Sequence, residues 1–385
     1  MRIVYISDSR IPSSSANSVH VMKMCQSFAK NGHSVVLLAR HGEAAAAEDY
    51  EIYGVQRNFE LRKIPWPRFK GGGFIYAWHC SRYVAGIPRP DLVYSRTIYG
   101  SLAASRRALS VVHESHTPPR NWQHSTMQRT VFRSARFRHL VVITRALEKE
   151  YLKLFPWLAE GRTLVAHDAA DMPSDSTPSY RPSRHWPGRR GLPQIGYVGQ
   201  LYPGKGMDLI GRLAFRMPDF DFHVVGGSRS EITHWRKTLP ARNLHFHGHV
   251  PHSQVFRYLK SFDVLLAPYQ RRVEAASGMS DIAPWMSPLK IFEYMAAGRA
   301  IVCSDLPVLR EVLEDQVNAL LVPPDDIEAW GVALRKLRDE PTLARALGGR
   351  AQEGVTARYN WDYRAERVVA PIARTADIEA LGGRL

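Results

Sequence analysis

The sequence has 385 residues, of which 45% are hydrophobic and 23% are charged. This length and apolar content suit a globular chain with two hydrophobic cores, and they exclude a small disulfide scaffold and a disordered protein. The formal net charge of +16 suits nucleic acid, an anionic membrane surface or phosphate-bearing substrates as partners. The excess is N-terminal, because residues 1–190 carry 28 basic and 14 acidic side chains (+14) and residues 191–385 carry 24 and 22 (+2).

The three cysteines, Cys25, Cys80 and Cys303, lie far apart in the sequence. This spacing indicates neither a disulfide framework nor a zinc site, and it favours a reducing compartment. The apolar run at the N-terminus is too short for a signal peptide, and no stretch approaches the roughly 18 apolar residues of a membrane-spanning helix. We therefore expect a cytoplasmic protein, with any membrane contact being peripheral on the inner membrane face.

Short apolar runs alternate with longer amphipathic segments in the first half of the chain. The runs predict strands at residues 3–6, 34–39, 92–94, 110–113, 140–143 and 163–166. The clearest helix covers residues 18–30, because Val19, Met22 and Cys25 fall on one stripe, and Asn31-Gly32 supplies a left-handed end. This alternation is typical of a parallel sheet with crossover helices.

Residues 172–193 are rich in Pro, Ser, Arg and Gly, which indicates an interdomain linker before the alternation restarts. The second half has predicted strands at residues 194–198, 222–225, 244–246, 264–267, 300–303 and 319–322, and predicted helices opening near Lys205, Arg229, His252, Pro288, Pro307 and Asp325. The predicted parts are a Rossmann-like domain (1–175), a linker (176–193), a second such domain (194–360) and a helix (361–385) that packs back on the first domain. Two such domains are expected to face a cleft at the carboxyl ends of their sheets, where ligands bind.

A glycine-rich turn at residues 199–206 follows the first strand of the second domain and leads into a helix. Gly199 and Gly204 allow backbone N–H groups to face a ligand, and Lys205 adds a point charge at the helix N-terminus. Such a turn can hold a diphosphate, although its spacing is not that of a Walker loop. The alternative is an ordinary turn with an exposed lysine.

The strand at residues 222–225 is flanked by two further signals. Asp219 and Asp221 form an Asp-x-Asp triplet, but it precedes the strand, on the side away from the cleft, and is interpreted as a turn. Gly227 follows the strand, on the cleft side, where it could let the chain approach a base or donor closely or simply turn.

Residues 287–298 have the pattern of a capped helix. Ser287 is predicted as the N-cap and Pro288 as the first helical residue, so that free amides there, including that of Leu289, can point at phosphate oxygens. Lys290 and Glu293 follow on neighbouring faces, and Glu293 could accept hydrogen bonds from a ribose diol. The alternative is a capped helix with a solvated Lys–Glu pair.

These segments, together with residues 304–313, 318–324 and 359–361, resemble the donor-binding half of glycosyltransferase family 4. Residues 17–36 resemble the family's first loop, first helix and following strand. The resemblance implies an α/β GT-B fold with two Rossmann-like domains. It also implies retaining transfer of a sugar from a nucleotide-diphosphate donor, a UDP-sugar or a GDP-sugar, to a glycan or lipid-linked acceptor. No metal or other cofactor is expected.

The resemblance also implies roles for single residues. Lys205 would neutralise the leaving diphosphate and Glu293 would bind the ribose. His116, after a first-domain strand, would approach the donor sugar, the alternative being a satisfied core histidine. The implied donor-binding set is Gly199, Gln200, Gly204, Lys205, Gly227, Ser287, Pro288, Leu289, Lys290 and Glu293, and the acceptor-side or phosphate-side set is Asn17, His20 and Glu114.

Two positions depart from the family's pattern. Gln200 stands where the family usually has an arginine, so one charge partner of the diphosphate is missing or comes from elsewhere. Trp285 stands near the position of the first of two glutamates, and Asp281 or backbone amides near Ser287 could replace that carboxylate.

The basic first half contains Arg129, Arg133, Arg136 and Arg138 interleaved with apolar residues, and a second cluster of Arg57, Arg62, Lys63, Arg68 and Lys70. We expect this half to dock on an anionic membrane and to receive an anionic or lipid-linked acceptor in cell-surface polysaccharide or glycolipid synthesis. The alternative is a helix that shows its arginines to water. No nucleic-acid-binding motif is present, and a nucleotide-sugar epimerase or a binding protein without activity remain other possible functions.

Overall fold

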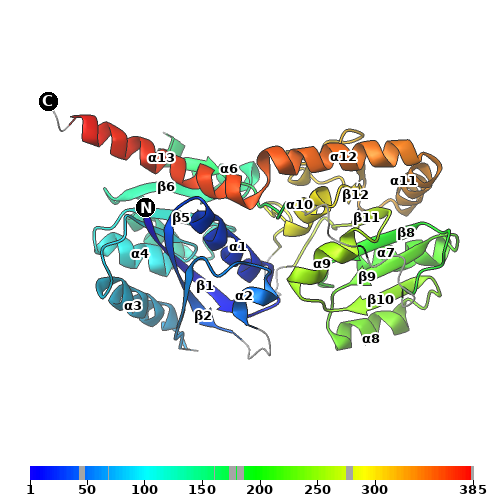
Figure 1. Ribbon diagram of the computed structural model, residues 1–385, viewed down its shortest axis with the longest axis horizontal. Helices are drawn as coiled ribbons and strands as arrows, with labels where there is room; N and C mark the ends of the chain where they lie inside the picture. Colours follow the sequence, from blue (N-terminus) through cyan, green and yellow to red (C-terminus); the bar gives the residue numbers. More distant parts are fainter. Residues whose placement is uncertain are drawn as a thin grey trace. The chain divides into compact units, whose positions relative to one another are not determined.

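The computed structural model describes residues 1–42, 48–67, 69–159, 161–172, 179, 186–274 and 281–382. The chain divides into two compact units, Met1–Asp168 with Trp361–Leu385, and Ala169–Asn360 (Figure 1). Each unit is an α/β structure built on its own parallel sheet, which confirms the predicted fold class. Half of the predicted linker at residues 176–193 lies outside the described residues.

A seven-stranded sheet in the order β3-β2-β1-β4-β5-β6-β7 forms the centre of the first unit. Its strands are β1 (Arg2–Ile11), β2 (Ser34–His41), β3 (Glu60–Ile64), β4 (Leu92–Ser95), β5 (Val111–Ser115), β6 (Phe137–Val142) and β7 (Thr163–Val165). All pairings are parallel, and β4 and β5 are buried along their whole length, which explains their continuous apolar runs. The edge strand β3 was not predicted, because three of its five residues are charged, as an edge strand tolerates.

Helices cover this sheet. They are α1 (Ala16–Lys30), α2 (Asp49–Ile52), α3 (Gly72–Ala85), α4 (Ile98–Arg106), α5 (Trp122–Phe132), α6 (Arg145–Leu154) and α13 (Trp361–Gly382), with a 3-10 turn at Pro156–Ala159. Helix α1 begins two residues before the predicted start, because Ser15 caps it by accepting a hydrogen bond from Ser18 N. It ends as predicted, with Gly32 in a left-handed conformation (φ +81°).

The last helix, α13, follows the second sheet in the sequence but packs on α1 of the first unit, as predicted (Figure 1). The Asp362 carboxylate accepts a hydrogen bond from Ser27 Oγ (2.5 Å), and the Asp362 carbonyl accepts one from Asn31 Nδ2 (2.9 Å). His139 Nε2 on β6 lies 3.0 Å from Val368 O. Residues from both ends of the chain therefore build one core.

A six-stranded parallel sheet in the order β10-β9-β8-β11-β12-β13 forms the centre of the second unit. Its strands are β8 (Gln194–Val198), β9 (Asp221–Val225), β10 (Leu244–Gly248), β11 (Val264–Ala267), β12 (Ala300–Ser304) and β13 (Leu320–Val322). Its helices are α7 (Met207–Arg216), α8 (Arg229–Thr238), α9 (His252–Leu259), α10 (Leu289–Ala296), α11 (Ile327–Asp339) and α12 (Pro341–Arg358). All six predicted strands are present, but the helix expected near Pro307 is only a 3-10 turn at Leu309–Glu311, because the backbone leaves the helical region at Val312 (φ −129°).

The Asp-x-Asp triplet lies at the amino end of β9, as predicted. Asp221 begins the strand, and its buried carboxylate accepts hydrogen bonds from Arg189 N (2.5 Å) and Nε (3.0 Å). Asp219 lies in the preceding turn and pairs with Arg338. Both carboxylates are therefore engaged in structural ion pairs.

The helices in the described part of the chain are all too short or too polar to span a bilayer.

Asn243 offers a test of the second unit. Its buried amide Nδ2 donates to three carbonyls, those of Ala214 (2.9 Å), Met217 (3.0 Å) and Phe220 (2.8 Å). Asn243→Ala should lower the free energy of unfolding by about 1–3 kcal/mol, because buried acceptors lose their donor. Urea denaturation measures this, with the exposed Arg242→Ala as the matched control. Equal losses in the two variants would contradict the assigned role.

Candidate functional site

The glycine-rich turn (199–206) begins at the carboxyl end of β8 and ends at Gly206, the residue before α7. Gly199 N donates to Val225 O (2.9 Å), which ties the turn to the end of β9. Gly206 caps α7 in a left-handed conformation (φ +89°), and an added Cβ would lie 2.1 Å from Pro268 O. The turn thus packs on the segment after β11 so closely that only glycine fits.

Gly204 and Gly227 border the same turn. Gly204 O accepts a hydrogen bond from Gln270 N (2.9 Å), again in the segment after β11. Gly227 follows β9 with φ +80°, and a Cβ there would lie 2.5 Å from Leu201 Cδ1. The structure therefore places the predicted glycines around one short stretch of backbone.

Two lysines converge on one tyrosine beside this turn. Lys205 Nζ lies 5.1 Å from the ring centroid of Tyr269, and Lys290 Nζ lies 5.3 Å from the same centroid and 3.6 Å from that of Tyr197. Burial lowers the pKa of Lys205 to about 8. Burial and the neighbouring charge of Lys205 lower the pKa of Lys290 well below its ordinary value, against the opposing effect of Glu293. The lowered pKa values show that the surroundings of Lys205 and Lys290 do not compensate two positive charges. An anion bound between the two lysines would stabilise their charged forms.

Helix α10 carries Lys290 and Glu293, but it begins one residue later than predicted. Pro288 occupies the cap position with extended backbone (ψ 122°), and Leu289 is the first helical residue. The prediction of Ser287 as N-cap was therefore wrong, because a proline with this ψ angle cannot be helical. The first amides of α10 belong to Leu289 and the residues after it.

Glu293 lies one turn beyond Lys290 and contacts a residue that the sequence did not point to. Its Oε1 lies 2.7 Å from Nε2 of His252, the first residue of α9, and both side chains are partly exposed. The pair brings together α9 and α10, which are far apart in the sequence. The only signal in the sequence is that His252 follows shortly after β10, which places it at the carboxyl edge of the sheet.

The positions that depart from the family's pattern have contacts of their own. Gln200 O accepts a hydrogen bond from Tyr197 OH (2.6 Å), which fixes the backbone of the turn. Asp281 Oδ1 accepts from Val273 N (2.9 Å) and Ala283 N (3.0 Å) and so orders its own loop. Trp285 N donates to Ile282 O (3.2 Å).

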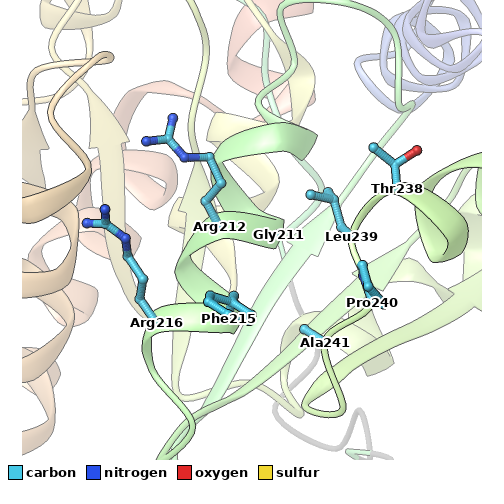
Figure 2. Close-up of a pocket in the computed structure, with 8 residues that line it drawn as sticks. All are labelled: Gly211, Arg212, Phe215, Arg216, Thr238, Leu239, Pro240 and Ala241. Carbon is cyan, nitrogen blue, oxygen red and sulfur yellow. The ribbon is translucent and has the colours of Figure 1, made fainter.

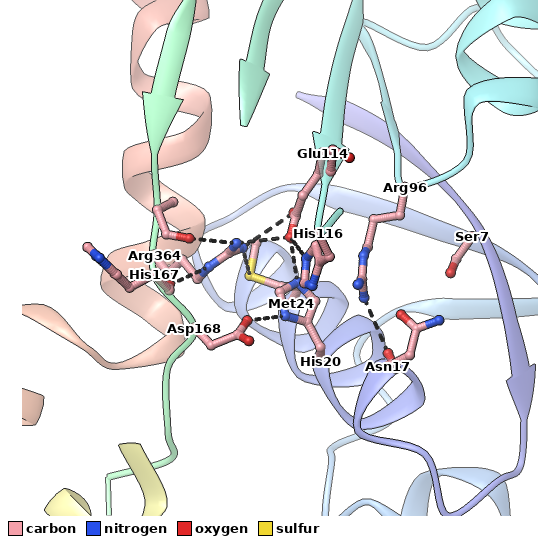
Figure 3. A network of polar contacts seen from close by, with 12 residues as sticks. Ser7, Asn17, His20, Met24, Arg96, Glu114, His116, His167, Asp168 and Arg364 are labelled. Carbon is pink, nitrogen blue, oxygen red and sulfur yellow. Dashed lines mark hydrogen bonds and ion pairs between the residues drawn. The ribbon is translucent and has the colours of Figure 1, made fainter. Parts of the chain in front are cut away.

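In the first unit, Glu114 is the centre of a buried polar network (Figure 3). Its Oε1 lies 2.6 Å from His116 Nε2, 3.0 Å from His20 Nε2 and 2.9 Å from Arg364 Nη2. Its Oε2 accepts a hydrogen bond from Tyr94 OH. The structure thus brings together three residues predicted for the acceptor or donor-sugar side and adds an arginine from α13.

The network continues on both sides of Glu114. His20 Nδ1 lies 2.7 Å from Asp168 Oδ1, and Arg364 Nε donates to His167 O (2.9 Å). Asn17 lies apart from Glu114, with its carbonyl accepting from Arg96 Nη1 (3.4 Å) and its side-chain oxygen buried without a hydrogen-bond partner among the described residues (Figure 3). Sequence reasoning missed Asp168 and Arg364, because no local pattern marks them.

Electrostatics set the charge states in this network. Burial alone would raise the pKa of the Glu114 carboxyl, but the charges of Arg364 and His20 and the hydrogen bonds from His116 and His20 hold it well below its ordinary value. Burial and the charge of Arg96 lower the pKa of His116 to about 4. Because an ionised Glu114 can only accept, a neutral His116 donates through Nε2 and leaves Nδ1 as a free acceptor. His116 is thus held in one tautomer.

The same residues have the composition of a cation site. Ligand atoms of His20, Glu114 and His116 lie within 4.8 Å of one another. However, the Glu114 carboxylate already bonds Arg364 and Tyr94, and a cation would have to compete with the guanidinium. We therefore assign no metal to this cluster.

A pocket of about 320 Å³ lies elsewhere on the second unit (Figure 2). It is lined by Gly211, Arg212, Phe215, Arg216, Thr238, Leu239, Pro240 and Ala241. These residues belong to the C-terminal part of α7 and the end of α8, so the pocket faces the amino edge of the sheet, away from the glycine turn. Arg212 pairs with Asp208 and Arg216 with Glu328, so its charged groups are already compensated.

Two family models match the chain. Residues 18–172 match the model described as Glycosyltransferase Family 4, and residues 192–340 match the model described as Glycosyl transferases group 1. Among similar proteins is a phosphatidyl-myo-inositol mannosyltransferase of Mycolicibacterium smegmatis, 33% identical over 164 residues, which are 41% of this chain and 39% of the relative. A putative teichuronic acid biosynthesis glycosyltransferase, TuaH of Bacillus subtilis, is 27% identical over 122 residues, 31% of this chain and 28% of the relative. The chain thus matches less than half the length of either relative.

Solved structures share the fold over nearly the whole chain. Anabaena Alr3699/HepE in complex with UDP has a TM-score of 0.72 at 14% identity, covering 97% of this chain and 100% of that one. Sucrose-phosphate synthase from Thermosynechococcus elongatus has a TM-score of 0.73 at 16% identity, covering 98% and 100%. At these identities the likeness establishes the fold, two α/β domains of the GT-B type.

Acid should destabilise the first unit through its buried histidines. Burial lowers the pKa of His113, His116 and His139 to about 4, so each stays neutral in the folded state while the unfolded chain takes up protons below about pH 6.5. Stability is therefore full above pH 6.5 and falls toward pH 4, by about 1–2 kcal/mol for each histidine between pH 7 and pH 5.

Urea denaturation at pH 7 and pH 5 measures this loss. His139→Gln should reduce it by one histidine's share, whereas the exposed His234→Gln should leave it unchanged. A pH dependence identical in wild type and His139→Gln would contradict the assignment.

Proposed function

Because the chain belongs to glycosyltransferase family 4, we propose that it transfers a sugar from a nucleotide-diphosphate donor to a glycan or lipid-linked acceptor, with retention of configuration. The observation that carries the proposal is Lys205, which lies in the glycine turn between the carboxyl end of β8 and the N-terminus of α7. Breaking the bond between sugar and phosphate develops negative charge on the diphosphate. Preorganised cations and helix N-termini stabilise that charge.

The donor site is proposed to lie on the second unit. The glycine turn and the start of α10 offer backbone amides to the diphosphate, and Glu293 accepts hydrogen bonds from the ribose. A UDP-sugar is the proposed donor, supported by the UDP bound in the HepE structure. Since lysines and helix ends can supply the positive charge at the leaving group, we propose transfer without a metal ion or other cofactor.

The first unit is proposed to supply the acceptor side. His116 would accept a hydrogen bond through its free Nδ1 and approach the donor sugar, held by Glu114 and, through it, by His20. Asn17, whose buried oxygen lacks a partner in the described chain, would face the acceptor or the phosphate. Positioned neutral groups of this kind can stabilise the positive charge that develops at the anomeric carbon without a covalent bond to the enzyme.

The first unit is also proposed to dock on the cytoplasmic face of an anionic membrane, where a lipid-linked acceptor would lie. Three aromatic side chains on or beside α3 are more than half exposed, namely Phe69 (62%), Phe74 (51%) and Trp78 (56%), and Arg82 stacks over Trp78. Exposed aromatics next to basic residues are typical of interfacial membrane contacts. The similarity to the mycobacterial phosphatidyl-myo-inositol mannosyltransferase supports a lipid acceptor.

The predicted basic residues also make contacts within the unit. Arg129 and Arg133 are exposed and stack over the ring of Trp157. Arg62 and Lys63 lie on β3 and pair with Glu60 and Asp49. Arg68 lies outside the described residues.

The donor site is tested by transfer assays with a panel of nucleotide sugars, with and without acceptors. Lys205→Ala should lower kcat/KM by about 100-fold or more, because a charge at the leaving group is lost. Glu293→Ala should lower it by about 10-fold, mainly through KM, because a ribose contact is lost. The matched control is Lys237→Ala, an exposed lysine on α8.

The assay also separates the alternative functions. Nucleotide release that needs an acceptor supports transfer, whereas interconversion of nucleotide sugars would indicate an epimerase. Binding without turnover would indicate a binding protein. This alternative rests on Gln200 and Trp285, the two positions that depart from the family's pattern. Unchanged rates in both Lys205→Ala and Glu293→Ala would contradict the proposed site.

Membrane docking is tested by co-sedimentation with vesicles. The double variant Phe74→Ser and Trp78→Ser should bind anionic vesicles at least about 10-fold more weakly, because two apolar side chains are lost from the interface. Phe215→Ser removes a more exposed aromatic (79%) from the second unit and should bind like wild type. Equal wild-type binding to anionic and neutral vesicles at low salt would contradict docking on an anionic surface.

A further inference from the structure

The turn that would hold a diphosphate has an uncharged residue at Gln200. The Gln200 carbonyl is engaged by Tyr197 OH (2.6 Å), so its backbone is fixed, but its side chain carries no charge. A diphosphate carries more negative charge than Lys205 alone can neutralise. A second cation must therefore come from another part of the unit.

Lys290 reaches the same turn from α10. A Cβ built on Gly199 would lie 2.9 Å from Lys290 Nζ and 3.0 Å from its Cε, so the lysine lies directly against the backbone of the turn. Its ammonium group lies over the Tyr197 ring at 3.6 Å from the centroid. The lysine thus occupies the space that a side chain on Gly199 would fill.

The Lys290 ammonium is buried and has no hydrogen-bond partner among the described residues. Tyr269 is 1% exposed, and both lysines approach its ring. Its hydroxyl is also buried without a hydrogen-bond partner among the described residues. An unpaired buried cation and an unpaired buried donor are each costly to a folded protein. The Lys290 ammonium and the Tyr269 hydroxyl lie close together, so one ligand with anionic oxygens could accept hydrogen bonds from both.

We propose that Lys290 is the second cation of the diphosphate site and takes the place of the arginine absent at position 200. This inference rests on the proposed function and names the residue that completes its donor site. Lys290 binds the phosphate oxygens from the side of α10, and Lys205 binds them from the side of the turn. Together they neutralise the leaving group.

A consequence is that donor binding takes up protons. The charged and titratable groups facing Lys290 are Lys205 from the turn, Tyr197 from β8, Tyr269 after β11, Cys303 from β12 and Glu293 on its own helix. Burial and the charge of Lys205 lower the pKa of Lys290 in the free protein, and burial lowers that of Lys205 to about 8. A bound diphosphate raises both values, so binding of UDP or GDP near pH 8 draws protons from the buffer, while the terminal phosphate of these nucleotides, with a pKa of about 6, releases none.

Isothermal titration of the full chain with UDP and GDP at pH 8, in Tris and in HEPES, measures affinity and proton uptake together. Titration with inorganic pyrophosphate measures affinity alone. Lys290→Met keeps the length of the side chain but removes its charge. It should weaken binding by about 10- to 100-fold, as the loss of a charged hydrogen bond does, and should reduce proton uptake. The control Lys237→Ala should change neither quantity.

The double variant Lys290→Met with Gln200→Arg separates charge from position. It should regain affinity, because an arginine restores the missing cation, but not the proton uptake, because arginine does not titrate. Thermal unfolding should show Lys290→Met to be at least as stable as wild type, since a buried amine without a hydrogen-bond partner among the described residues is replaced by an apolar group.

The outcomes are distinct. Wild-type binding with unchanged affinity and proton uptake in Lys290→Met overturns this inference and leaves the proposed function standing. Absence of binding of all three probes by the wild type overturns the proposed function and this inference with it.

Discussion

Two ammonium groups packed around one tyrosine ring are the constraint on which the rest of the account depends. Lys205 and Lys290 both lie near Tyr269, and the described chain offers the Lys290 ammonium no hydrogen-bond partner. A folded protein tolerates such an arrangement only when the surrounding structure is stable enough to hold it. The continuous core beneath the second sheet, including the fully buried Trp330, provides that stability. We propose that an anionic ligand, the diphosphate of the donor, offsets this cost when it binds.

The polar network of the first unit differs from the lysine pair, because its buried charge has partners. Glu114 is buried but surrounded by Arg364, Tyr94, His20 and His116, so its charge is compensated on every side. Removing a partner from such a network is costly, which makes the network rigid. Rigidity is what a positioned histidine needs, because His116 is then held in one orientation and one tautomer. The second unit thus has buried cationic groups where we propose that the donor diphosphate binds, and the first unit has a compensated network where we propose that His116 is positioned.

The sequence predicted the sheets well, because parallel strands buried on both faces appear as apolar runs. It failed at β3, whose charged residues match an edge strand, and at the cap of α10, where Pro288 and not Ser287 takes the position before the helix. Whether a segment pairs as an edge strand, and which residue caps a helix, depend on neighbouring elements and on backbone angles. A single segment of sequence does not determine either feature.

The candidate site divides in the same way. Lys205, Lys290, Glu293 and His116 could be predicted because each lies in a motif or next to a strand end. Arg364, Asp168 and His252 were missed, since their partners lie on other elements and are reached only after folding. The convergence of both lysines on Tyr269 was missed for the same reason: the tyrosine follows β11, whereas the lysines come from the turn and from α10.

The most direct test of the central claim is a crystal structure of the chain with UDP bound. The account predicts phosphate oxygens at about 2.7–2.9 Å from both Lys205 Nζ and Lys290 Nζ, with the ribose hydroxyls on Glu293. A nucleotide bound elsewhere, or one that leaves the Lys290 ammonium without a phosphate contact, would contradict it.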